Sequence, residues 1–223
     1  MADSVEVLGV RLNCLTAKEI MLKVMQFMEN DLVDTIEILS MDALMKGRED
    51  EEWKGLFREF DLVLPGEAEI LKGAEIADRG MLKETENRIF LKLFLKYLQK
   101  NQKKVFLLAE TEEELRRAGD AVRRYSRGVR LAGGGIISAE DNREESVINE
   151  INGRDGLYPF CPYAPLSGAV YYEEQTSAQR KSVAGLRRCV YGKLRRAQAG
   201  WQAAASYQKV YVLLACREGT IET

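Results

Sequence analysis

The sequence predicts an α/β fold, in which a mostly parallel sheet is covered by helices on both faces in a three-layer, Rossmann-like arrangement. Short apolar runs of strand length alternate with amphipathic stretches of helical length over residues 5–155. The helical stretches begin at capping signals. Hydrophobic residues make up 46% and charged residues 30%, as in an ordinary globular protein, and 223 residues can build one good core.

The individual elements follow from local patterns. Residues 5–14 alternate apolar and polar side chains, which predicts a strand with a kink at its glycine. Thr16 and Glu19 form a capping box that opens a helix to about Asn30. Further strands are expected at 35–39, 61–65, 105–109 and from 129 to the glycines at 133–135. Thr111 and Glu114 form a second capping box, which opens a helix to about residue 125. Further helices are expected at 42–47, around 53–57, and at 67–77, 88–100 and 142–152.

The composition excludes several kinds of site. The chain has no histidine, which excludes Ser-His-Asp and Cys-His hydrolysis and His-ligated zinc. Its four cysteines show no CxxC spacing, so we expect neither a metal site nor a disulfide framework. A net charge of −2 argues against general nucleic-acid binding. No apolar run is long enough to cross a bilayer and nothing marks a signal peptide, so we expect a cytoplasmic protein.

Candidate ligand-binding residues lie at the expected carboxyl ends of the strands, because parallel sheets bind ligands there. Gly133, Gly134 and Gly135 either let the backbone approach a phosphate or form a loop that leaves a strand, and no GxGxxG or Walker pattern accompanies them. Glu67 and Glu69 are candidate general bases. The alternative for these two residues is a solvated first helical turn, where the helix dipole favours acidic side chains.

Four segments occur in the order and spacing of one protein family: VLGVRLNCLTAKE, DLVLP, VFLLA with the Glu-rich helix after it, and ESVINEINGRD. Through them, residues 5–155 resemble the WecG/TagA/CpsF glycosyltransferases. The resemblance implies transfer of an N-acetylhexosamine of the N-acetylmannosamine class from a UDP donor to an undecaprenyl-diphosphate-linked acceptor. Such enzymes build cell-envelope polysaccharide or teichoic acid in bacteria. The resemblance implies a reaction that needs no histidine, no essential metal cluster and no further cofactor.

The resemblance also suggests a general base. Many family members carry an Asp directly after the proline of the LVLP strand, as the proposed base that activates the acceptor hydroxyl. Here that position is Gly66, and Glu67 follows it. Glu67 is therefore the expected base, with Glu69 and Asp61 as its competitors.

Substrate-binding positions follow in the same way. A Thr-x-Asn-x-Glu stretch of the family corresponds to Ile38, Ser40 and Asp42, of which the last two keep a polar side chain. A family arginine falls near Glu84, with Arg88 the closest arginine. With the strand-end residues, the expected substrate-binding set is Asn13, Thr16, Ser40, Asp42, Arg88, Gly133, Gly134 and Gly135.

The chain changes character after residue 155. Its last 68 residues hold no Asp or Asn, seven of nine Tyr, and nine Lys or Arg against four Glu. The next strand of the family, its Pro-x-x-Gln-Glu motif, a glycine-ended strand and a basic tail do not occur there. If the coding DNA is read in the neighbouring frame, the codons permit all four features, in the order of the family. We therefore divide the chain into a glycosyltransferase core, 1–155, and an atypical basic segment, 156–223, that is out of frame relative to the family.

In this interpretation the sheet lacks its last one or two strands, which leaves an edge strand unpaired. The activity of the protein is then impaired. The alternative is a genuine C-terminal domain, with a basic helix around 176–206 that lies on an anionic membrane. The expected partners are the UDP-sugar, the lipid-linked acceptor and, peripherally, the inner face of the plasma membrane. A homo-oligomer is compatible with the sequence.

Two other functions stay open. A non-catalytic nucleotide-sugar-binding or interaction protein is suggested by the substitutions at Gly66 and Ile38. An unrelated α/β protein with an interaction tail predicts no binding of UDP.

Overall fold

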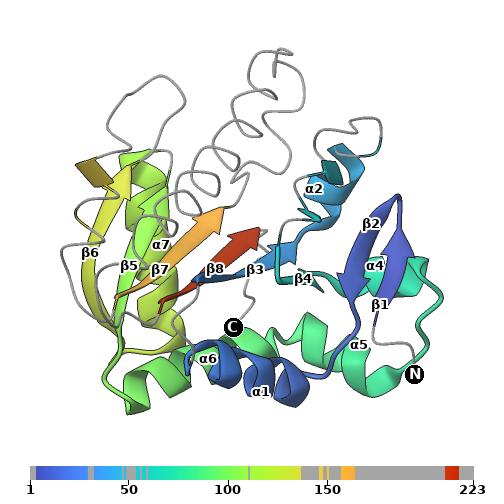
Figure 1. Cartoon of the computed structure of the whole chain (residues 1–223), viewed down its shortest axis with the longest axis horizontal. Helices are drawn as coiled ribbons and strands as arrows, with labels where there is room; N and C mark the ends of the chain where they lie inside the picture. The colour runs from blue at the N-terminus through green and yellow to red at the C-terminus, as the bar shows by residue number, and fades with distance from the viewer. Residues whose placement is uncertain are drawn as a thin grey trace.

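A computed structural model describes residues 4–29, 33–46, 48, 54–55, 57–58, 60–109, 111–136, 146–147, 150, 157–163 and 209–215. The strands in these ranges are β1 (Ser4–Val7), β2 (Val10–Asn13), β3 (Val33–Leu39), β4 (Leu62–Pro65), β5 (Lys104–Ala109), β6 (Arg130–Ile136), β7 (Leu157–Tyr163) and β8 (Lys209–Ala215). The helices in these ranges are α1 (Ala17–Phe27), α2 (Met41–Lys46), α4 (Ala68–Gly73), α5 (Arg79–Glu86), α6 (Ile89–Lys100) and α7 (Glu112–Tyr125) (Figure 1).

One parallel sheet is the centre of the fold. Its strands follow the order β4-β3-β8-β7-β5-β6, and every neighbouring pair in this part of the chain is parallel (Figure 1). Strands of such sheets are apolar along their whole length because both faces are covered, and β4 and β5 are buried in this way. The predicted α/β class and the parallel sheet are confirmed.

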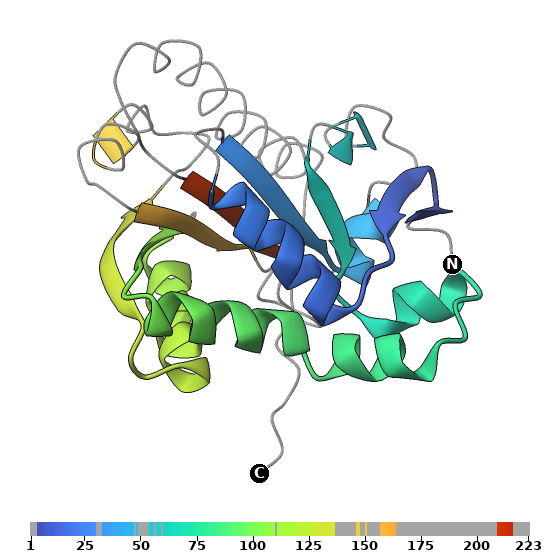
Figure 2. The ribbon, with the colours of Figure 1, turned by 60° about the horizontal axis from the view of Figure 1, so that its bottom comes forward.

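Three helices, α1, α6 and α7, cover one face of this sheet. Their apolar stripes meet every second residue of the strands, such as Ile36 of β3, Leu64 of β4 and Leu107 of β5. Fully buried Phe94 and Leu95 lie near the middle of α6. Figure 2 shows α1 lying over the strands with α6 beside it. This layer forms the larger core.

On the other face, the described residues place the β1–β2 hairpin, α2 and α4 around the β4 end of the sheet. Leu12 of the hairpin, Leu44 of α2 and Ile70 of α4 pack with Leu39 and Val63 of the strands. Helices over the rest of this face do not occur in the described ranges, so the predicted three-layer arrangement is not confirmed.

The segment 5–14 forms a hairpin, so the prediction of one kinked strand is wrong. β1 and β2 are antiparallel, with Val7 paired to Val10 across a two-residue turn. Both turn residues have positive φ, 51° at Leu8 and 81° at Gly9. Such turns match the twist of the flanking strands. The side chains alternate as predicted, but the chain reverses where we expected only a kink.

The predicted capping residues start helices as expected. Thr16 Oγ1 accepts a hydrogen bond from the Glu19 amide at 3.3 Å, and the Glu19 carboxylate accepts one from the Thr16 amide at 2.8 Å. Thr111 likewise accepts from the Glu114 amide at 3.2 Å and begins α7. We did not predict α5, which begins at the cap Asp78. The expected helices around 53–57 and at 142–152 fall largely outside the described residues.

The C-terminal segment supplies two central strands. β7 lies beside β5, and β8 lies between β7 and β3. The expectation that the sheet lacks its last strands is therefore wrong. The runs LYPFCPY and KVYVLLA are rich in aromatic and aliphatic residues, the composition that favours strands. β6 also differs from the prediction, because it continues through the glycines at 133–135 to Ile136.

Candidate functional site

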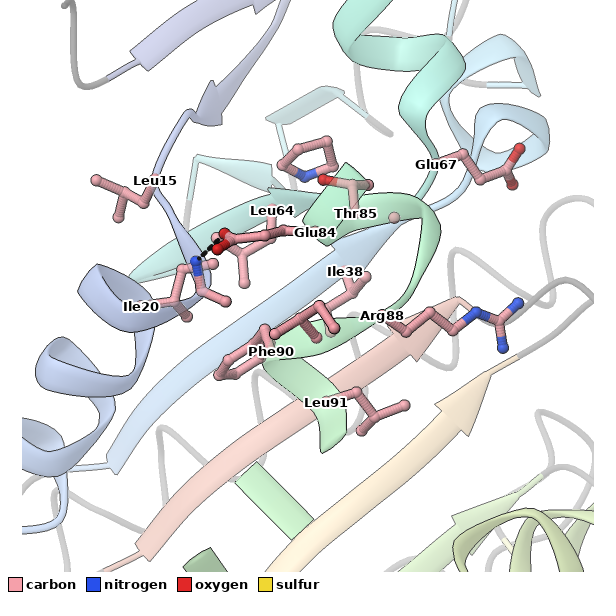
Figure 3. A pocket seen from close by; sticks show the side chains of 14 residues that line it. Leu15, Ile20, Ile38, Leu64, Glu67, Glu84, Thr85, Arg88, Phe90 and Leu91 are labelled. Carbon is pink, nitrogen blue, oxygen red and sulfur yellow. Dashed lines mark hydrogen bonds between the residues drawn. The ribbon is translucent and has the colours of Figure 1, made fainter. Parts of the chain in front are cut away.

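A pocket opens at the carboxyl ends of β3 and β4, between the start of α1 and the junction of α5 with α6 (Figure 3). Carboxyl ends of parallel strands are the usual place for ligands in α/β folds. Most of the wall is apolar, with Leu64 and Phe90 among its residues. Its charged residues are Glu67, Glu84 and Arg88. Apolar walls with a few polar groups are typical of small-molecule sites.

Arg88 is the one cationic side chain among the described residues of this wall. It follows the C-cap of α5, where its φ of 51° and ψ of 43° are left-handed. Glycine is the usual residue at such a helix end, since a Cβ makes this conformation unfavourable. The Arg88 Nη1 atom donates to the hydroxyl oxygen of Tyr125, on α7, at 3.3 Å. The predicted substrate-binding arginine therefore lies at the pocket.

Glu84 holds the start of α1. Its carboxylate accepts a hydrogen bond from the Ala17 amide at 2.8 Å, a contact visible in Figure 3. An amide in the first turn of a helix has no partner within that helix, so this bond stabilises α1 from outside. Of the two positions considered for the family arginine, Glu84 supports the fold of the pocket and Arg88 brings it a positive charge.

Glu67 lies on the pocket wall and precedes α4. Its Oε1 atom accepts from the Met41 amide at the start of α2, at 3.3 Å. The carboxylate therefore joins α2 to the pocket. This position suits a proton acceptor, and it suits a purely structural contact equally well.

Gly66 fills the position where many family members carry Asp. Its amide donates to the Leu39 carbonyl oxygen at 2.8 Å. A Cβ at residue 66 would lie 2.8 Å from that same oxygen, closer than real Cβ atoms come. The strand ends are too close here for a side chain, which explains the departure from the family pattern.

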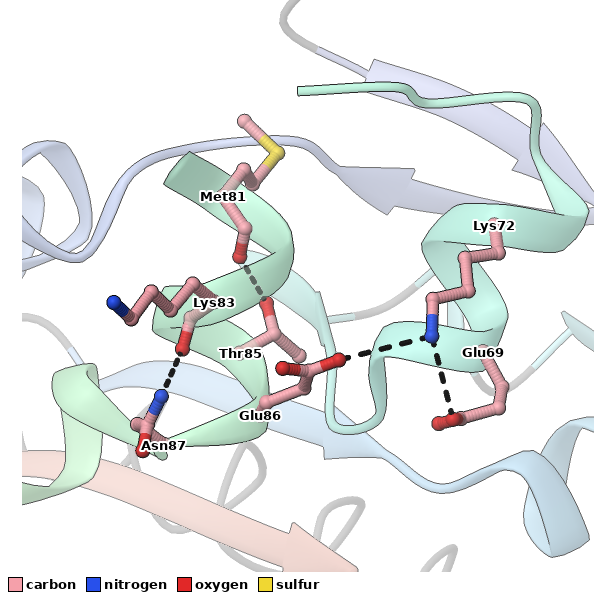
Figure 4. A network of polar contacts seen from close by, with 7 residues as sticks. All are labelled: Glu69, Lys72, Met81, Lys83, Thr85, Glu86 and Asn87. Carbon is pink, nitrogen blue, oxygen red and sulfur yellow. Dashed lines mark hydrogen bonds and ion pairs between the residues drawn. The ribbon is translucent and has the colours of Figure 1, made fainter. Parts of the chain in front are cut away.

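The two competing base candidates lie away from the pocket wall. Asp61 precedes β4, at the amino end of the strand, and accepts from the amide and hydroxyl of Thr35 at 2.7 and 2.8 Å. Glu69 is exposed and forms an ion pair with Lys72 at 3.8 Å, and Lys72 also pairs with Glu86 at 3.7 Å (Figure 4). The structure does not bring either carboxylate to Arg88.

Three other candidates, Ser40, Asn13 and Thr16, accept hydrogen bonds from backbone amides, and a fourth, Asp42, lies in the first turn of a helix. Ser40 accepts from the Ala43 amide at 3.2 Å and caps α2, while Asp42 stands in the first turn of that helix. Asn13 accepts from the Val63 amide at 2.9 Å, so it joins the hairpin to the edge strand β4. Thr16 belongs to the capping box of α1. None of these four side chains is on the pocket wall.

The three glycines lie inside β6, on the far side of the sheet from the pocket. A Cβ at Gly134 would lie 2.7 Å from Leu115 on α7, and one at Gly135 would lie 2.5 Å from Val147. Close packing against these side chains explains glycine at both positions. A contact of these glycines with a phosphate stays a prediction.

Sequence reasoning missed the Arg88–Tyr125 contact and the fully buried carboxylate Glu37. The first joins residues 37 positions apart, and no local pattern marks such a pair. Glu37 stands in β3 between apolar neighbours and is 0% exposed. Cys14, beside Asn13, is buried, and this burial raises the pKa of its thiol, so it stays protonated at neutral pH.

A metal site and a membrane-spanning helix each need a recognisable arrangement of residues. No group of three or more Cys, Asp or Glu side chains within these ranges is arranged to hold a metal ion. No helix within the same ranges is long and apolar enough to cross a membrane.

A parallel α/β sheet with a pocket at its strand ends is the architecture of many enzymes that act on nucleotide-linked substrates. The family model described as "Glycosyl transferase WecG/TagA/CpsF family" matches residues 5–155. This match covers more than half of the chain, so the protein belongs to the WecG/TagA/CpsF family of glycosyltransferases. None of the curated proteins compared with the chain matches it. The predicted family is confirmed.

Proposed function

We propose that the protein transfers an N-acetylhexosamine of the N-acetylmannosamine class from a UDP donor to an undecaprenyl-diphosphate-linked acceptor. The product would be a precursor of a cell-envelope polysaccharide or teichoic acid. The observation that carries this proposal is the family match over residues 5–155, within which the wall of the pocket lies.

The charges of the pocket support a diphosphate donor. Arg88 offers planar N–H groups that suit phosphate oxygens. Glu67 and Glu84 offer acceptors for sugar hydroxyls, and the apolar wall suits the carbon face of a sugar or of a base. The proposal needs no metal ion, since Arg88 itself offsets charge on the leaving group.

The transfer step follows from these positions. The acceptor hydroxyl forms a bond to the anomeric carbon of the donor sugar, while the bond from that carbon to the UDP oxygen breaks. The hydroxyl proton passes to the carboxylate of Glu67. The electron pair of the broken bond goes to UDP, and the Arg88 guanidinium stabilises the negative charge that develops there.

A lipid-linked acceptor places the reaction at a membrane surface, and we propose that the protein works peripherally at the inner face of the plasma membrane. We also propose that residues 156–223 are out of frame relative to the family, and that activity is impaired because the family's Pro-x-x-Gln-Glu motif and basic tail are missing. The coding DNA around codons 152–158 tests this part. An intact frame shared with relatives would rule it out.

The second candidate is a nucleotide-sugar-binding protein without catalysis. Two contacts favour it: Gly66 leaves no space for the family Asp, and Glu67 already binds the Met41 amide. Both candidates predict UDP binding, which calorimetry measures. They differ in turnover, measured as transfer of labelled N-acetylmannosamine from UDP to a synthetic prenyl-diphosphate-linked acceptor. An interaction protein of a different kind would bind no UDP.

A further inference from the structure

The side chain of Arg88 is fixed at both ends. Its backbone occupies a left-handed turn in which its amide donates to the Thr85 carbonyl oxygen at 3.0 Å and its own carbonyl accepts from the Lys92 amide at 3.1 Å. Its guanidinium donates to the Tyr125 hydroxyl oxygen at 3.3 Å. A left-handed non-glycine residue persists when its surroundings require it, and such residues gather at functional sites.

Tyr125 is itself held firmly. It is the last residue of α7, is half-buried, and packs against the larger core. A guanidinium can only donate hydrogen bonds, so the phenol oxygen is the acceptor in this contact. The hydroxyl of a packed aromatic ring is a fixed point, unlike the end of a flexible chain. It therefore limits the rotation of the guanidinium.

We propose that Tyr125 is a positioning residue, which holds the Arg88 guanidinium in the orientation that receives the diphosphate of a nucleotide-sugar donor. The inference rests on the proposed function for the identity of the ligand, and on the Arg88–Tyr125 contact for the geometry. An arginine that is already ordered loses less conformational freedom when it binds a phosphate, so the donor binds more tightly.

The first test is a double-mutant cycle with UDP binding measured by calorimetry on the full chain. Tyr125→Phe keeps the packed ring and removes the acceptor, and we expect the Kd for UDP to rise about three- to tenfold. In an Arg88→Lys background, which keeps the positive charge but has no planar guanidinium to orient, the same Tyr125→Phe change should have no further effect on the Kd. The control is Tyr97→Phe, which removes a hydroxyl from the half-buried tyrosine of α6 and should leave the Kd unchanged.

The second test needs no ligand. The Nη hydrogens of Arg88 are followed by nitrogen-15 NMR in the wild type and in Tyr125→Phe. We expect the guanidinium to rotate slowly in the wild type and markedly faster in Tyr125→Phe, with no change in Tyr97→Phe.

A Tyr125→Phe variant that binds UDP like the wild type, or that weakens binding equally in both backgrounds, would overturn the positioning role. Failure of the wild type to bind UDP would overturn the proposed function instead. The positioning role would then be decided by NMR alone, and equal rotation rates in the wild type and Tyr125→Phe would refute it.

Discussion

The amide of Gly66 donates to the carbonyl oxygen of Leu39 at 2.8 Å, so the ends of β4 and β3 lie in direct contact where Gly66 lines the pocket. A Cβ at Gly66 would meet that oxygen at 2.8 Å and Ile38 Cγ2 at 3.1 Å. The residue that separates this chain from many relatives is therefore required by its own packing.

Gly66→Ala should destabilise the protein by about 1–3 kcal/mol, because the added methyl group must displace backbone. Gly66→Asp, which restores the residue of the family, should destabilise it at least as much and should not restore activity. Urea denaturation measures both. Gly73→Ala is the matched control, since its added methyl group would have no atom within 4 Å and alanine is the better helix former. Unchanged stability of Gly66→Ala would show that the two strand ends can separate easily.

Arg88→Gly should raise stability and abolish UDP binding. Glycine takes the left-handed conformation without the penalty of a Cβ, so we expect the free energy of unfolding to rise by up to about 1 kcal/mol. Loss of the hydrogen bond to Tyr125 reduces this gain. Glu75→Gly is the matched control, because Glu75 has a φ of 58° at the end of α4 and is not on the pocket wall. That variant should gain stability and keep UDP binding. Loss of binding in both variants would mean that the effect comes from the backbone.

The capping box of α1 makes stability depend on pH. Hydrogen bonds from the side chain and then the backbone of Thr16 lower the pKa of Glu19 from its ordinary value of 4.5. A lowered folded-state pKa stabilises the protein above 4.5, and this contribution is lost as the pH falls through the folded-state value. The wild type should therefore lose more stability than Glu19→Gln between about pH 5 and pH 3.

Thermal unfolding of the two proteins across this pH range measures the difference. Parallel curves would show that the Glu19 carboxylate makes no such contribution. Thr16→Ala should cost about 1 kcal/mol at neutral pH, as the loss of a helix cap usually does.

Glu67→Gln should reduce transfer about 100-fold or more in a form of the protein that is active, because the amide cannot accept the acceptor proton. It should leave UDP binding nearly unchanged. Glu69→Gln is the matched control, since that exposed carboxylate pairs with Lys72 away from the pocket wall. Full transfer activity in Glu67→Gln would exclude Glu67 as the base and favour the candidate without catalysis.

Local sequence signals predicted where helices begin, but they did not predict which distant segments pack or pair with one another. Thr16 and Thr111 start helices because a cap needs only the next three residues. The glycines at 134 and 135 have the sequence of a loop, and only the packing of Leu115 and Val147 against them explains their place in a strand. The central positions of β7 and β8 depend on pairing across the sheet, which sequence periodicity does not encode.

Only some of the candidate site residues predicted from the sequence lie at the pocket. Arg88 and Glu67 were named from the family pattern, and both lie on the pocket wall. Asp61 and Glu69 were named for their nearness in sequence to the LVLP strand. The first lies at the opposite end of that strand, and the second points to Lys72 on the surface. Residues close in sequence to a strand end need not lie at the pocket.

The most direct test of the central claim is calorimetric titration of the full-length protein with UDP, beside Arg88→Gly. We predict one saturable site in the wild type and no measurable binding in Arg88→Gly, because the diphosphate needs the pocket's cation. Absence of UDP binding by the folded wild type, or equal binding by both proteins, would contradict the assignment of this pocket as the donor site.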